Sequence, residues 1–112
     1  MRREIAAISM YSMAAMAVNA SPLSAQEAMT AGSLGDHFTN REESAYLAGV
    51  IEGLGYARFL KDDKDETGMK CIKDWFYDGE GTQAKILDAF DLYPDYPVGP
   101  ILWALSKQQC GE

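Results

Sequence analysis

Apolar residues recur at helical spacing along most of the chain after residue 39. Thr39-Asn40-Arg41-Glu42 has the form of a capping box, because a hydroxyl at a helix start is followed three residues later by a carboxylate. The apolar positions behind it repeat every three or four residues: Tyr46, Leu47, Val50, Ile51, Leu54 and Ala57. This pattern predicts a helix of about five turns that ends in the charged segment KDDKDETGMK, with Gly68 as its stop.

Shorter helices are predicted behind this segment. CIKDWFY predicts a short helix that carries Cys71 and ends at Gly79 and Gly81, and Thr82 is suited to cap the next helix. The buried face of that next helix is expected to contain Ile86, Leu87, Ala89, Phe90 and Tyr93. A last helix is expected from around Val98–Pro100 to Cys110, with four side chains pointing inward: Ile101, Leu102, Ala104 and Leu105.

The two prolines of Pro94-Asp95-Tyr96-Pro97 predict a sharp turn before this last helix, because neither can continue a helix in which it would fall. No stretch alternates with period two for long enough to predict a sheet. The fold class is therefore predicted to be all-α, a small single-domain bundle of about four helices over residues 39–112. Residues 26–38 are expected to form a flexible lead-in.

A row of small residues follows one face of the long helix, at every fourth position: Ala45, Gly49, Gly53 and Ala57. Glycine inside a helix costs about 1 kcal/mol, so two in one row suggest that another backbone packs closely against them. The partner is either another helix of this chain, which we favour, or a second copy in a homodimer.

The first 25 residues have the layout of a signal peptide. Arg2 and Arg3 precede an uncharged stretch from Ile5 to Ala20, and small residues around Pro22 suit cleavage near Ala25. The uncharged stretch is shorter than the ~20 apolar residues that cross a bilayer, so we expect no stable membrane anchor. This interpretation predicts export to the periplasm.

Export changes the meaning of the two cysteines, because disulfides form and persist outside the cytoplasm. Cys71 and Cys110 are then expected to form one bridge that ties the last helix to the middle of the chain. The alternative, a reactive cysteine with His37 as its base, requires a free thiol.

The chain is acidic, with a net charge of −7. Cleavage would remove Arg2, Arg3 and Glu4, leaving 8 basic and 16 acidic residues and a net charge of −8. Such a charge repels phosphate backbones and anionic lipids, so nucleic acid and membrane surfaces are not expected as partners, whereas a basic protein surface is.

The sequence contains one pattern that resembles a metal site. Five residues fall at ligand or turn positions of a calcium-binding loop: Asp63, Asp65, Thr67, Gly68 and Asp74. Lys70 stands where that loop needs an apolar residue, and Asp74 stands where a longer glutamate is expected, so a solvated linker is the better interpretation. Catalytic motifs are not apparent, and we expect neither an enzyme nor a metal or cofactor.

Four features together resemble the Tai-type immunity family: YLAGVIEG from Tyr46, Cys71-Ile72, a helix that ends at Tyr93-Pro94, and ALSKQQC from Ala104. Lys73 and Gln109 stand where that family often has proline. The resemblance implies a small exported helical protein that binds and inhibits a peptidoglycan amidase effector of type VI secretion. It also implies that homodimers can form. The alternatives are a periplasmic acid-stress chaperone and a structural or interaction protein of the envelope.

The candidate partner-binding residues lie in the connections before and after one helix, where a rigid bundle can present aromatic and acidic groups. They are Tyr77, Asp78, Glu80, Tyr93, Asp95 and Tyr96.

Overall fold

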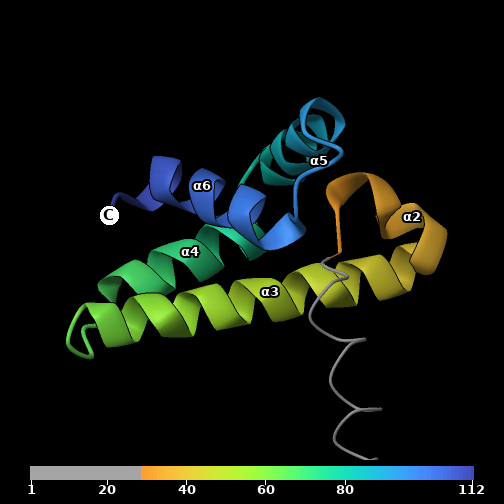
Figure 1. Ribbon diagram of the computed structural model, residues 1–112. Coiled ribbons are helices and arrows are strands. Elements are labelled where there is room, and N and C mark those ends of the chain that lie inside the picture. The colour runs from red at the N-terminus through yellow and green to blue at the C-terminus, as the bar shows by residue number, and fades with distance from the viewer. Residues whose placement is uncertain (1–28) are drawn as a thin grey trace, which may run out of the picture.

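The computed structural model describes residues 29–112, and they form an all-α domain, as predicted (Figure 1). Its elements are η1 (Ala31–Ser33), α2 (Leu34–His37), α3 (Asn40–Lys61), α4 (Thr67–Asp78), α5 (Thr82–Leu92) and α6 (Val98–Cys110). The four longer helices correspond to the four that the sequence predicts. The predicted signal peptide, residues 1–25, lies outside the described residues.

The longest helix, α3, is the base on which α2, α4 and α6 pack, whereas α5 packs on α4, α6 and η1. All of them lie on one side of α3 (Figure 1). The predicted capping box is present: the Thr39 amide donates to Glu42 Oε1 at 2.9 Å, and the Glu42 amide donates to Thr39 Oγ1 at 3.3 Å. Helix α4 folds back along α3 after a turn in which Asp63 and Lys64 have positive φ angles. Ile51 is fully buried under the other helices.

Gly68 does not end the long helix, contrary to the prediction. It is buried in the first turn of α4, where an added Cβ would lie 2.6 Å from Arg58 Nε. The missing side chain lets α4 approach α3 here, and a contact of this kind cannot be distinguished from a helix stop in the sequence. Gly55 makes a looser approach of the same kind, 3.4 Å from Met69 Cγ.

Most of the row of small residues faces away from the rest of the domain. Ala45, Gly49, Gly53 and Ala57 are exposed, and no described atom outside the adjacent backbone of α3 lies within 4 Å of a Cβ added at Gly49 or Gly53. Gly53 lies two residues after buried Ile51, which places it about 200° around the helix axis. The prediction that the row packs against another helix of this chain is therefore wrong, while the homodimer alternative stays a prediction.

The lead-in is packed over residues 29–38, so the prediction of a flexible segment is wrong there. Ala31 and Leu34 are buried in the core. The segment also pairs with the proline turn: the amides of Ala31 and Gly32 donate to the carbonyls of Tyr96 and Pro94 at 2.9 and 2.8 Å. These backbone bonds are invisible to an analysis of side-chain periodicity.

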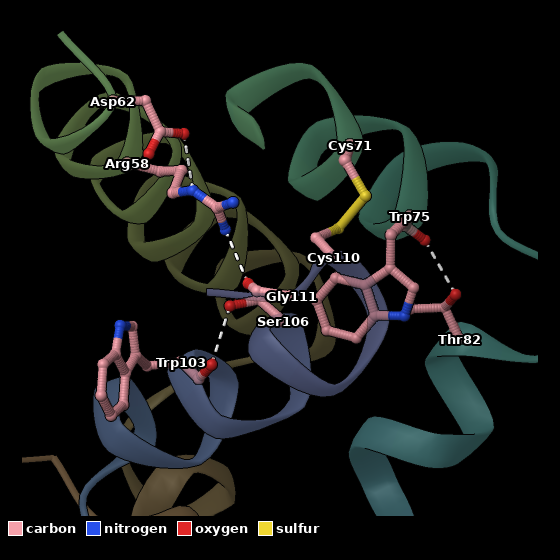
Figure 2. The surroundings of a disulfide bond; sticks show 9 residues. All are labelled: Arg58, Asp62, Cys71, Trp75, Thr82, Trp103, Ser106, Cys110 and Gly111. Carbon is pink, nitrogen blue, oxygen red and sulfur yellow. Dashed lines mark hydrogen bonds and ion pairs between the residues drawn. A yellow bond between two sulfur atoms is a disulfide. The ribbon is translucent and has the colours of Figure 1, made fainter. Parts of the chain in front are cut away.

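The core lies where α4, α5 and α6 meet above α3. Trp75, Phe90 and Leu102 are buried there. Thr82 is the first residue of α5 and not its cap, which is Gly81 with φ 76°. The buried Thr82 hydroxyl instead donates to the Trp75 carbonyl at 2.8 Å, which joins the start of α5 to α4 (Figure 2).

Four side chains that were predicted to be buried are exposed: Ala57, Leu87, Tyr93 and Ala104. Ala57, Leu87 and Ala104 lie on helices that are covered on one side only, and Tyr93 follows the end of α5. The helical spacing therefore identifies the right helices but overestimates the width of their buried faces.

The predicted disulfide is confirmed. Cys71 of α4 is bonded to Cys110 at the end of α6, with their Cα atoms 5.9 Å apart (Figure 2). Beside it, Arg58 Nη1 donates to the Gly111 carbonyl at 2.7 Å, so α3 also holds the end of α6. A disulfide of this kind indicates an oxidising compartment outside the cytoplasm. Within residues 29–112, no helix has the length and apolar character needed to cross a membrane.

We expect Cys110→Ser to lower the free energy of unfolding by about 4 kcal/mol, because the bridge closes a loop between residues 39 apart in the sequence. Chemical denaturation of both proteins measures the difference. Denatured but unreduced wild-type protein should also resist alkylation, and labelling of both cysteines without reductant would contradict the bridge.

Two glycine substitutions should have opposite effects on stability. Gly49→Ala should raise the free energy of unfolding by about 1 kcal/mol, since the site is open and alanine favours helix. Gly79→Ala should lower it, because the added Cβ would overlap Thr82 Oγ1 and the Trp75 carbonyl oxygen. Thermal unfolding of the two variants compares them, and a destabilised Gly49→Ala would show that its face is covered in solution.

Candidate protein-binding site

The six predicted binding residues are all exposed, and they form two groups at the two ends of α5. Tyr77, Asp78 and Glu80 make the Tyr77 group, and Tyr93, Asp95 and Tyr96 make the Tyr96 group. The 11 residues of α5 separate them by roughly 16 Å. The structure therefore presents two separate surfaces and not one patch.

The Tyr96 group carries the larger apolar surface. Tyr93 and Tyr96 pack edge to face, with their ring centroids 5.4 Å apart, and both remain half exposed or more. Leu92 beside them is 73% exposed, and we had not predicted its part in this surface. In the sequence, the exposure of Leu92 is indicated only by its position between Asp91 and the proline turn. We call residues 92–96 the aromatic turn.

The backbone of the aromatic turn is held from outside. The carbonyls of Pro94 and Tyr96 accept from Gly32 and Ala31, and the Val98 amide donates to the Met29 carbonyl at 3.0 Å. Within the turn, the Tyr96 amide donates to the Tyr93 carbonyl at 3.2 Å. The turn is thus ordered before any partner arrives, which reduces the conformational entropy lost on binding.

The Tyr77 group is tied to α3 through Glu52. The Tyr77 hydroxyl donates to Glu52 Oε1 at 3.0 Å, and Lys73 Nζ lies 3.1 Å from Glu52 Oε2. The hydrogen bonds from Lys73 and then Tyr77 lower the pKa of Glu52. Partial desolvation, followed by the bond to Glu52, raises the pKa of Tyr77. The phenol is therefore fixed in direction and neutral at physiological pH.

A groove of about 620 Å³ runs beside Tyr77, between α3, α4 and α5. Its apolar side chains include Leu47, Phe76 and Leu87, and Glu43 is its one charged residue. No single stretch of the sequence indicates this groove, because its walls come from α3, α4 and α5. Leu87, which we had assigned to the core, is 46% exposed there.

The structure does not provide the geometry for a reactive cysteine or for a calcium-binding loop, the two alternatives considered from the sequence. The sulfur atoms of both cysteines are in the disulfide, and His37 is exposed at the end of α2. The residues of the calcium-like pattern do not form a loop, because α4 already begins at Thr67 and includes Asp74. Asp65 instead accepts from the Thr67 amide at 2.8 Å, and its hydrogen bonds with Thr67 lower its pKa. Within residues 29–112, no three His, Cys, Asp or Glu side chains gather as metal ligands would.

No family model, curated protein or solved structure matches this chain. The resemblance to the Tai-type family therefore stays a prediction.

The Glu52 network makes a prediction about pH. Because the folded-state pKa of Glu52 is lowered, its ionised form stabilises the fold above the unfolded-state pKa, and this contribution is lost as the pH falls through the folded-state pKa. Lys73→Met should raise the pKa of Glu52 towards its ordinary value, and Tyr77→Phe should raise it less. Titration of the Glu52 side-chain carbon by NMR measures this. Tyr93→Phe is the control, and an unchanged pKa in Lys73→Met would disprove the network.

Proposed function

We propose that this chain is a non-catalytic protein-binding domain that acts outside the cytoplasm and engages its partner through the aromatic turn. One observation carries the proposal: Leu92, Tyr93 and Tyr96 expose large apolar surfaces on a backbone that residues 29–32 hold in place. Exposed apolar side chains gathered in this way mark interaction sites.

The chemistry of the turn suits recognition of a protein. Tyrosine is enriched among the residues that dominate binding energy, because it buries a large area and keeps a polar end. Asp91 and Asp95 place carboxylates beside the rings, and the whole chain carries a net charge of −7. A partner with a basic rim around an apolar pocket is the best complement, since opposite charges accelerate encounter.

The family resemblance supports a specific form of this function. We propose that the chain is a periplasmic immunity protein, exported by a signal peptide that is cleaved near Ala25, and that it inhibits a peptidoglycan amidase effector of type VI secretion. A short turn at the end of a rigid bundle has a suitable shape to enter the substrate groove of such an enzyme. The exposed row from Ala45 to Ala57 is the surface on which a second copy would pack in a homodimer.

The proposal predicts that Tyr96→Ala weakens partner binding by roughly 30-fold, the loss of about 2 kcal/mol that defines a binding hot spot. Asp95→Ala should weaken it less, mainly by slowing association. The test needs a cognate amidase effector, and a secreted amidase encoded by a neighbouring gene would be the first candidate. The measurement is the dissociation constant for that effector, together with survival of cells that export it. Melting temperatures of both variants should stay close to that of the wild type, since both side chains are exposed.

Tyr56→Ala is the matched control, because Tyr56 is 58% exposed and Tyr96 is 57% exposed. It should bind the effector as the wild type does. If Tyr77→Ala loses binding and Tyr96→Ala does not, the working surface is the Tyr77 group. Full protection by all of these variants would contradict the proposed role of the aromatic turn.

A further inference from the structure

Basic side chains gather at one place on this acidic domain. Three of the eight Lys and Arg residues in 29–112, Arg58, Lys61 and Lys107, line a hollow of about 120 Å³ between α3 and α6. Leu54 and Ile72 contribute apolar surface to it. A small hollow that combines apolar surface with several cations suits a short chain that ends in an anionic group.

Trp103 forms one wall of this hollow and fixes a cation beside it. Its indole is half exposed, and Lys107 Nζ lies 4.0 Å from the ring centroid. Figure 2 shows Trp103 on the side of α6 that faces away from the disulfide and from Trp75. The tryptophan is therefore not a core residue, and its ring is accessible to a ligand that reaches Lys107.

The hollow already contains a carboxylate from this chain. Glu112 Oε1 lies 2.7 Å from Lys107 Nζ, although the Glu112 side chain is 75% exposed. The hydrogen bond and charge of Lys107, with a smaller contribution from the charge of Lys61, lower the pKa of Glu112. An exposed side chain at such a position is easily displaced, because an exposed ion pair contributes little to stability.

The other cations differ in how firmly they are engaged. Arg58 is held by Asp62 at 2.7 Å and by the Gly111 carbonyl, so it supplies positive charge but few free donors. Lys61 makes no ion pair within residues 29–112. If the Glu112 side chain leaves, the lining of the hollow keeps three positive charges, of which Arg58 stays paired with Asp62. This surplus favours a new anion.

We propose that this hollow is a binding site for a carboxylate group, and that the Glu112 side chain occupies it as an internal competitor. Lys107 and Lys61 would hold the carboxylate, and Trp103 and Leu54 would pack against the short aliphatic chain behind it. The ligand is either a free small carboxylic acid or the side chain of an acidic peptide. This site is separate from the aromatic turn and does not depend on the proposed immunity function.

The test is an NMR titration that follows the Trp103 indole N–H. Sodium acetate and a capped Ala-Glu-Ala peptide are the two probes, each added to about 50 mM, well above the ~1 mM range of weak binding. Glu112→Gln should bind up to about 5-fold more tightly than the wild type, because removal of the competitor raises the population of the open site. Lys107→Gln should bind about 10-fold more weakly. Near-UV circular dichroism shows whether each variant keeps the fold.

Asp88→Asn is the matched control, since it removes one negative charge elsewhere and should leave the affinity unchanged. Tighter binding of acetate supports a free acid as ligand, whereas tighter binding of the peptide supports an acidic side chain. A Trp103 response that chloride or inorganic phosphate reproduces at equal ionic strength would overturn carboxylate specificity. Equal affinities of wild type and Glu112→Gln would overturn the claim that Glu112 competes with the ligand. No response in either protein would overturn the claim that the hollow binds a carboxylate.

Discussion

The covalent link between α4 and α6 compensates for a small core. Only a few large side chains are fully buried in residues 29–112, among them Leu34, Ile51 and Leu102. A chain this short leaves a large share of its surface exposed, so burial alone gives marginal stability. The Cys71–Cys110 bond holds α6 beside α4, and Trp75 then fills the space between these helices and α5. The contacts that α6 makes with α5 and α3 are stabilised by this closure.

The arrangement of the helices also explains why large apolar side chains are exposed. Since the helices pack on one side of α3, each covers its neighbours along a narrow strip, and large apolar side chains remain outside. Some of these have clear local roles, such as Trp103 under Lys107. Others, such as Leu92, are largely exposed and give the aromatic turn its apolar character.

The sequence predicted the helices well because their starts and spacing are local properties. The Thr39–Glu42 box and the two prolines at 94 and 97 act within a few residues, and both gave correct boundaries. The disulfide was predictable because the chain has only two cysteines. The glycines were harder: Gly68 has a close neighbour and Gly49 has none, although both are glycines in helices. That difference depends on tertiary packing, which spacing does not encode.

The candidate sites were predictable only in part, for the same reason. Tyr93, Asp95 and Tyr96 were identified because a turn and its aromatic residues are adjacent in the sequence. The groove beside Tyr77 and the hollow beside Trp103 combine side chains from distant helices, so no single stretch indicates them. The packed lead-in was missed because much of its contribution is made by backbone amides, and its two buried side chains, Ala31 and Leu34, are too few to show a period.

The pairing of residues 29–32 with the proline turn links the two ends of the domain. The shape of the aromatic turn is set by amides that precede the first long helix, so it depends on a segment that makes no part of its exposed surface. During synthesis this segment emerges first, yet its hydrogen-bonding partners emerge almost last. The turn consequently acquires its final form only after nearly the whole domain has been made. Trimming by a protease, or fusion of a bulky tag just before Met29, can therefore alter the shape of the aromatic turn from a distant part of the sequence.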